Sequence, residues 1–230
     1  MLLKKDVWLS KQIGFNAYNL KKNQRLNFGK LEKKILITLK VKKTQKKILK
    51  KKIQKNFKFI DVNYKFVKKI KDKNFLNNQN YFCRFSNLND KQKIVSIAKE
   101  AFRYSRFQID KRIPKILFER IQLEWINNFF KGKRGTDLIV AKKNKRIAGF
   151  LLILVKRNKM YIDLIATSPK FQRTGVAKSM INFAVKNINF RNFEIEVGTQ
   201  KKNHNSIIFY KKIGFKKKSE TAIYHYLKLN

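Results

Sequence analysis

The chain has 230 residues, with 57 Lys or Arg against 14 Asp or Glu, so its formal net charge is +43. Hydrophobic residues make up 43% of it, which is enough for a core and excludes a wholly disordered chain. One cysteine excludes a disulfide framework, and the longest apolar run, residues 147–155, is too short to span a membrane. Because residues 1–10 contain no apolar segment of signal-peptide length, we expect a cytoplasmic location.

The positive charge indicates a polyanionic partner, and its distribution along the chain bears on that interpretation. The net charge is +20 in residues 1–80 and +23 in residues 81–230, and most of it is carried by lysine. Lysine here accompanies abundant Asn, Ile and Phe, all of which have A/T-rich codons, so a compositional bias explains much of the excess. A basic surface that serves phosphate-bearing substrates is the functional alternative. We therefore expect no specific nucleic acid partner.

The first 80 residues give weaker patterns because lysine interrupts them. Residues 31–41 predict a strand, and residues 44–56 predict an amphipathic helix that faces a core, with a membrane-surface helix as the alternative. Residues 57–70 alternate and predict one or two strands, and the polar residues 71–80 predict a linker. We expect residues 1–80 to form an N-terminal α/β portion.

From residue 81 the periodicities are clearer and predict one further domain, residues 81–230. We predict strands at residues 81–85, 137–141, 147–155, 160–166, 193–197 and 222–229, and helices from Asn89 or Asp90 to about Tyr104 and at residues 115–130, 175–187 and 205–213. The resulting order, β-α-α-β-β-β-α-β-α-β, is typical of a mixed sheet with helices on both faces. The predicted fold class is therefore α/β (α+β).

The segment from Ile165 to Ala177 contains the clearest chemical signal, because a strand ends there, a loop follows and a helix begins at Gly175. The first N–H groups of a helix have no intrahelical acceptors and carry the positive end of the helix dipole, so they favour an anion such as a diphosphate. The alternative is an ordinary turn between a strand and a helix.

The residues Gln172-Arg-Thr-Gly-Val-Ala177 resemble the Q/R-x-x-G-x-G/A motif of the GNAT acetyltransferase superfamily. The stretch from Asn203 to Phe215 resembles the N-x6-Y-x3-G-F block of the same superfamily. This resemblance implies the GNAT fold, in which a central sheet is splayed at the strand that holds acetyl-CoA. It also implies an N-acetyltransferase with acetyl-CoA as co-substrate.

Four shorter blocks, at residues 100–107, 125–127, 197–200 and 219–224, look like the TDP-fucosamine acetyltransferases. That resemblance implies a nucleotide-linked amino-deoxy sugar as the acceptor and a role in surface polysaccharide biosynthesis. Residues 44–70 faintly echo the end of the chain, so a degenerate GNAT half within residues 1–80 stays open.

The superfamily resemblance also implies roles for individual residues. The backbone of Leu164, Ile165 and Ala166 would bind the pantetheine, and the pyrophosphate would be held by Phe171, Gln172, Arg173, Thr174, Gly175, Val176 and Ala177, with Lys178 adding a charge. Asn203 would contact coenzyme A, with helix capping as the alternative that is compatible with this role. Tyr210 would be the general acid for the thiolate, and a core tyrosine is the alternative. Arg106 and Phe107 would meet the sugar nucleotide.

No residue is evident as a general base. Asp163 lies on the central predicted strand, but a side chain there can simply point into the sheet. Glu194 and Glu196 alternate with apolar neighbours, which predicts a solvated face. The chain has two histidines, His204 and His225, and a metal site built on them lacks further support, so we expect no metal.

Two alternative functions stay open. One is a GNAT enzyme that acts on a protein amine or a polyamine, although a strongly positive protein would repel a cationic acceptor. The other is a basic protein that binds nucleic acid, which predicts strong and salt-dependent binding. A homodimer also stays open.

Overall fold

The computed structural model describes residues 3–20, 26–42, 55–70, 80–189 and 194–229. In these residues a mixed ten-stranded sheet has the order β1-β2-β3-β10-β4-β9-β8-β7-β6-β5. Its strands are β1 (Leu3–Lys5), β2 (Asn16–Leu20), β3 (Ile35–Lys42), β4 (Lys58–Lys69), β5 (Phe82–Phe85), β6 (Asp137–Lys143), β7 (Arg146–Lys156), β8 (Lys159–Thr167), β9 (Glu194–Gln200) and β10 (Lys216–Lys228). The described α-helices are α1 (Val7–Ile13), α3 (Lys91–Ala101), α4 (Arg106–Ile109), α5 (Lys115–Phe130), α6 (Val176–Asn187) and α7 (His204–Lys212).

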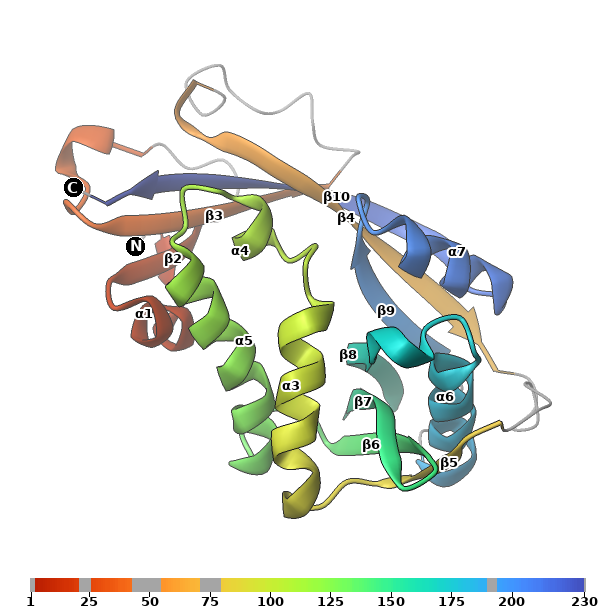
Figure 1. The fold of residues 1–230 in the computed structure, drawn as a ribbon. Helices are drawn as coiled ribbons and strands as arrows, with labels where there is room; N and C mark the ends of the chain where they lie inside the picture. Colours follow the sequence, from red (N-terminus) through yellow and green to blue (C-terminus); the bar gives the residue numbers. More distant parts are fainter. Residues whose placement is uncertain (1–2, 21–25, 43–54, 71–79, 190–193, 230) are drawn as a thin grey trace.

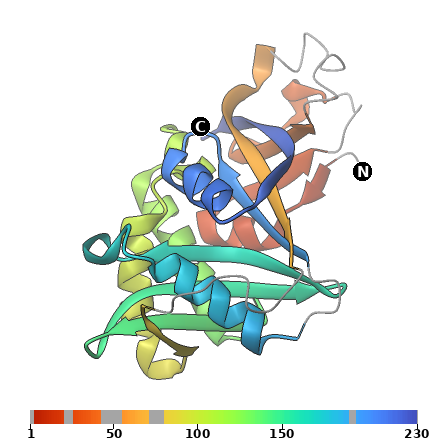
Figure 2. The same cartoon turned by 90° about the vertical axis from the view of Figure 1, so that its right-hand side faces the viewer.

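The helices lie on both faces of the sheet, as predicted (Figures 1 and 2). On one face α6 and α7 pack on an apolar cluster that includes Phe66, Met180 and Tyr210. On the other face α3 and α5 cover β6, β7 and β8, and α1, α4 and α5 cover β2 and β3. None of the described helices is long and apolar enough to cross a membrane.

The predicted elements from residue 81 onward are confirmed in type and order, and α5 has the predicted bounds. One difference is that α3 ends at Ala101 rather than at about Tyr104, and the short α4 follows it. Four residues are too few for a periodic pattern, and α4 begins because the Ser105 hydroxyl accepts a hydrogen bond from the Phe107 N–H. Asp90 precedes α3 as predicted, but its carboxylate binds Arg84 instead of the helix N–H groups.

The N-terminal residues contribute to the same sheet. The strands predicted at residues 31–41 and 57–70 are confirmed as β3 and as one long strand, β4. β4 lies between β9 and β10, and β3 pairs with the other side of β10. The sequence patterns missed β1, α1 and β2. The predicted helix at residues 44–56 lies outside the described residues except for residues 55 and 56. The predicted linker at residues 71–80 lies outside them except for residue 80.

Candidate functional site

The sheet opens between β8 and β9. A register shift on β8 leaves Asp163 as an additional residue between Ile162 and Leu164, and such a bulge bends a strand. The parallel pairing of β8 with β9 covers Met160 to Ile162, and no pairing is found beyond it in the described strands. On its other edge β9 pairs with β4 along its whole length. The second half of β8 and the end of β9 therefore diverge, which is the splay implied by the superfamily resemblance.

The loop after β8 leads directly to the start of α6. Gly175 has φ +95°, a conformation that strains other residues, and an added Cβ would find Asn80 Nδ2 as its nearest neighbour at 3.8 Å. The Thr174 hydroxyl donates to the Phe171 carbonyl at 2.7 Å and lies 2.5 Å from the Tyr81 hydroxyl. These contacts hold the loop so that the free N–H groups of α6 have open space beside them. Such a place fits a diphosphate.

Gly149 on β7, which the sequence patterns did not single out, sets the position of α6. A Cβ at Gly149 would lie 2.6 Å from the Ala166 carbonyl oxygen and 2.8 Å from the Val176 Cγ1. The glycine thus lets the first turn of α6 pack closely over β7 and β8. Its importance follows from the packing of three elements and has no signal in the local sequence.

Asn203 lies at the start of α7 and Tyr210 within it, and α7 packs on the same apolar cluster as α6. The Asn203 side chain accepts a hydrogen bond from the Ser206 N–H at 3.2 Å and caps α7, so the capping interpretation is confirmed. Tyr210 is only 2% exposed and packs against Phe66 and Phe215. Burial raises the pKa of Tyr210 above its ordinary value. The phenol therefore stays protonated at neutral pH, and burial also makes it a weaker acid.

Three carboxylates on β8 and β9, those of Asp163, Glu194 and Glu196, are ion-paired. Arg134 donates two hydrogen bonds to Asp163, at 2.6 and 3.0 Å. Glu194 pairs with Lys159, and the hydrogen bond from Lys159 lowers the pKa of Glu194 by more than its partial burial raises it. The solvated face predicted for Glu196 is wrong, because this residue is 5% exposed and its charge is balanced by Lys65. None of these three carboxylates stands free as a general base.

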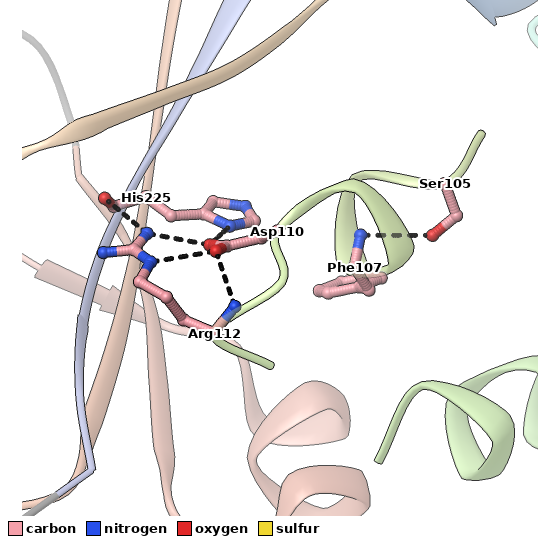
Figure 3. A network of polar contacts seen from close by, with 5 residues as sticks. All are labelled: Ser105, Phe107, Asp110, Arg112 and His225. Atoms are coloured by element: carbon pink, nitrogen blue, oxygen red, sulfur yellow. Dashed lines mark hydrogen bonds and ion pairs between the residues drawn. The ribbon is translucent and has the colours of Figure 1, made fainter. Parts of the chain in front are cut away.

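A second polar network lies between α4 and β10 (Figure 3). The Asp110 carboxylate lies 3.0 Å from His225 Nδ1 and accepts two hydrogen bonds from the Arg112 guanidinium, at 2.9 and 2.8 Å. Arg112 also donates to the His225 carbonyl at 3.4 Å. The Phe107 ring stacks on the imidazole with centroids 6.3 Å apart. The network therefore joins the α4 segment to the sheet.

The charges in this network are fixed by burial and by hydrogen bonding. Burial alone would raise the pKa of Asp110, but hydrogen bonds from His225 and Arg112 hold it far below its ordinary range. Burial lowers the pKa of His225, which is 0% exposed, by more than Asp110 raises it. His225 is thus neutral, and its Nδ1–H donates to the Asp110 carboxylate. Its Nε2 has no hydrogen-bond partner in the described part of the chain.

The sequence patterns missed this network. The two predicted substrate residues, Arg106 and Phe107, lie at its edge, and the Arg106 guanidinium is 4.6 Å from the Phe107 ring centroid. Asp110 and His225 are 115 residues apart in the chain, and no motif signals their contact. Within the described ranges, no group of three or more His, Cys, Asp or Glu side chains has an arrangement that could hold a metal ion.

The bulged strand β8, its divergence from β9 and the helix α6 that starts behind them are the main features of this mixed α/β fold. A family model described as an acetyltransferase (GNAT) domain matches residues 104–228. The chain belongs to the GNAT acetyltransferase family. Among curated proteins it is similar to the spore coat polysaccharide biosynthesis protein SpsD of Bacillus subtilis, with 27% identity over 137 residues, which are 59% of this chain and 47% of that protein. The match thus spans about half the length of the relative.

Solved structures support the fold. A functionally unknown protein from Staphylococcus epidermidis has a TM-score of 0.70 at 12% identity and covers 96% of this chain and 89% of its own. A GCN5-related N-acetyltransferase from Sphaerobacter thermophilus has a TM-score of 0.57 at 12% identity, with 86% of this chain and 61% of its own covered. At these identities the likeness concerns the fold alone.

Proposed function

We propose that the protein transfers an acetyl group from acetyl-CoA to the amino group of a nucleotide-linked amino-deoxy sugar, with a TDP-linked sugar as the leading candidate. The observation that supports acetyl transfer most directly is the end of the β8–β9 pairing at Ile162, after which β8 continues unpaired with β9 to Thr167 and the loop to α6 follows. An acyl thioester placed in that opening would have its diphosphate beside the free N–H groups of α6. Residues 81–230 would be the unit that performs this transfer.

The proposed roles follow the order of the chain. The backbone of residues 164–166 binds the pantetheine, and the amides of residues 171–177 hold the pyrophosphate, with Lys178 adding positive charge. Asn203 contacts coenzyme A while it caps α7. Tyr210 donates a proton to the departing thiolate, since the phenol is protonated at neutral pH, although its raised pKa makes it a weaker acid.

Two observations support a sugar acceptor linked to a phosphate. The similar SpsD protein is named for the biosynthesis of spore coat polysaccharide. The net charge of +43 would attract a phosphate-bearing acceptor and repel a polyamine. A sugar amine is less basic than a lysine amine, so water can deprotonate it, which agrees with the ion-paired carboxylates at the splay. The reaction would take place in the cytoplasm, and a homodimer is compatible with it.

A turnover screen tests this proposal. The full chain is given acetyl-CoA and a panel of nucleotide-linked amino sugars, a polyamine and a lysine peptide, and release of the free thiol of coenzyme A is measured. We expect turnover with at least one nucleotide sugar and none with the polyamine. Turnover with the peptide or the polyamine alone would mean that the acceptor is a cationic amine and not a nucleotide-linked sugar. Absence of turnover with every amine, together with salt-dependent binding of DNA or RNA, would favour the nucleic-acid alternative.

A further inference from the structure

The face of the sheet beneath α4 carries two cations that lie close together. Lys40 on β3 and Arg106 at the start of α4 repel each other, and this repulsion adds to the loss of water around the Lys40 ammonium in lowering its pKa. Burial lowers the pKa of Arg106 to about 10, which is unusual for a guanidinium. Lys40 is exposed and Arg106 is partly exposed, so both are accessible to an anion from solution.

No carboxylate of the described residues forms an ion pair with Arg106. The carboxylate that acts on it electrostatically is Asp6, but the Asp6 side chain accepts a hydrogen bond from the Leu9 N–H and caps α1. The nearest compensating contact is the Phe107 ring, 4.6 Å away, which offers a weak cation–π attraction. The guanidinium therefore keeps donors for a ligand.

A second, independent feature lies on the same face. Asp61 on β4 is 3% exposed, and its Oδ2 has no hydrogen-bond partner among the described residues. Asp61 pairs with Ile223 on β10, and Ile223 pairs with Lys40 on β3, so the three side chains share one face in one row. An orphaned buried carboxylate oxygen is costly, and a hydroxyl group from a ligand would satisfy it.

The row of Lys40, Ile223 and Asp61 runs across the sheet toward the place where β8 and β9 separate. Asn63, two residues beyond Asp61, pairs with Gln200 at the end of β9. From strand spacings, Asp61 is then about 8 Å from the end of β9, and Lys40 is roughly 15 Å from it. A small amine at the splay would reach neither cation. A sugar ring followed by a diphosphate would pass Asp61 first and then reach Arg106 and Lys40.

We propose that Arg106 and Lys40 bind the diphosphate of the acceptor, and that Asp61 accepts a hydrogen bond from its sugar ring. The inference rests on the proposed function and adds to it the site of the acceptor. The network of Asp110, Arg112 and His225 acts as a support, because it fixes the α4 segment over β10 and thereby holds Arg106 above the row.

The experiment is a titration of the full chain with thymidine diphosphate and with inorganic pyrophosphate, in the presence of saturating coenzyme A. The coenzyme fills the site at α6, so further binding reports a second diphosphate site. We expect Arg106→Gln to weaken thymidine diphosphate binding at least 10-fold, Lys40→Gln to weaken it a few-fold, and Arg106→Lys to retain most of it. The matched control is Arg103→Gln, because Arg103 is exposed and three residues away.

Asp61→Asn provides the separate test of the sugar contact. We expect it to change thymidine diphosphate affinity by less than 2-fold and to raise the KM for the amino-sugar nucleotide several-fold. Thermal melting of each variant establishes that it is folded. The inference is overturned if Arg106→Gln binds like the wild type, if Arg103→Gln loses as much affinity, or if the coenzyme-saturated protein binds neither probe.

The outcomes separate the inference from the function on which it rests. Acetyl transfer to an amino sugar without a second diphosphate site would keep the function and overturn the subsite. Binding of thymidine diphosphate through Arg106 without turnover of any amine would support the subsite and contradict the acetyl transfer.

Discussion

The proposed donor side and the proposed acceptor side of the sheet are built in different ways. On the donor side the ligand would meet backbone groups of one short segment, residues 164–178, and a glycine with positive φ shapes the loop. Beneath α4 the polar groups are side chains from β3, β4, α4 and β10, and several of them are deeply buried. A backbone site suits a ligand that every member of a family shares. A site of converging side chains suits the ligand that distinguishes one member from another.

The ion pairs on the two sides differ in the same way. Asp110 and His225 have fully buried side chains, whereas both partners of the Asp163–Arg134 pair near the splay are about one quarter exposed. A buried charge that loses its partner cannot be solvated, and a partly exposed one can. The acceptor side should therefore depend more strongly on its charges for stability.

The largest expected effect is on stability and tests this difference directly. We expect Asp110→Ala to lower the free energy of unfolding by about 3–5 kcal/mol, because it leaves the buried His225 Nδ1–H without an acceptor and the Arg112 guanidinium without its carboxylate. Asp163→Ala should cost about 1 kcal/mol or less. Urea unfolding of both variants measures the two values. Equal losses would mean that burial does not separate the two sides.

The second effect concerns catalysis on the donor side. We expect Tyr210→Phe to lower kcat about 100-fold and to leave acetyl-CoA affinity nearly unchanged, because the phenyl ring keeps the contacts with Phe66 and Phe215 and only the proton donor is lost. Steady-state kinetics and a binding titration measure the two quantities. Tyr224→Phe on β10 is the control. Full activity of Tyr210→Phe over a broad pH range would remove the general acid role.

The same contrast explains what the sequence made predictable. The donor side could be found because its groups follow one another within residues 164–178, and the strands and helices around it have regular periods. The network of Asp110 and His225 could not be found, because its contact depends on how β10 pairs with β3 and β4. The burial of Glu196 was missed for the same reason, since Lys65 reaches it from another strand.

The N-terminal residues show a further limit. Strand β1 has three residues, two of them lysines, and β2 has five, so both are too short for a reliable alternation. The position of β4 between β9 and β10 depends on pairings with residues more than 100 positions away. Local patterns therefore predicted most elements correctly and gave no information on how the first 80 residues join the sheet.

A third, smaller effect is expected at the glycine of the donor loop. Gly175→Ala should cost about 1–2 kcal/mol of stability through its positive φ and should also weaken acetyl-CoA binding by shifting the loop amides. Gly132→Ala is the matched control, since Gly132 has φ +68° and an added Cβ there would meet nothing within 4 Å. Unfolding titrations should show similar losses of stability for Gly175→Ala and Gly132→Ala. Coenzyme titrations should show weaker binding for Gly175→Ala only. Equal affinities would argue against a backbone site at this loop.

The smallest effect is a pH dependence of stability on the acceptor side. Because burial lowers the pKa of His225 in the folded chain, the unfolded chain takes up a proton near pH 6.5 that the folded chain does not. Stability should therefore fall with decreasing pH, by at most about 0.7 kcal/mol from pH 7 to pH 6 for this one group. Asp110, whose pKa is lowered, adds a further loss only as the pH falls below about 4.

His225→Gln isolates this contribution, because glutamine can still donate to Asp110 but does not titrate. Urea unfolding at pH 7 and pH 6 should show a difference for the wild type and a smaller one for His225→Gln. His204→Gln serves as the control, since His204 is exposed at the start of α7 and its replacement should leave the wild-type difference unchanged. A wild-type stability that rises between pH 7 and pH 6 would mean that His225 is charged in the fold. A protonated His225 would add a third positive charge beside Arg106 and Lys40. The proposed acceptor side would then need a bound anion even more strongly.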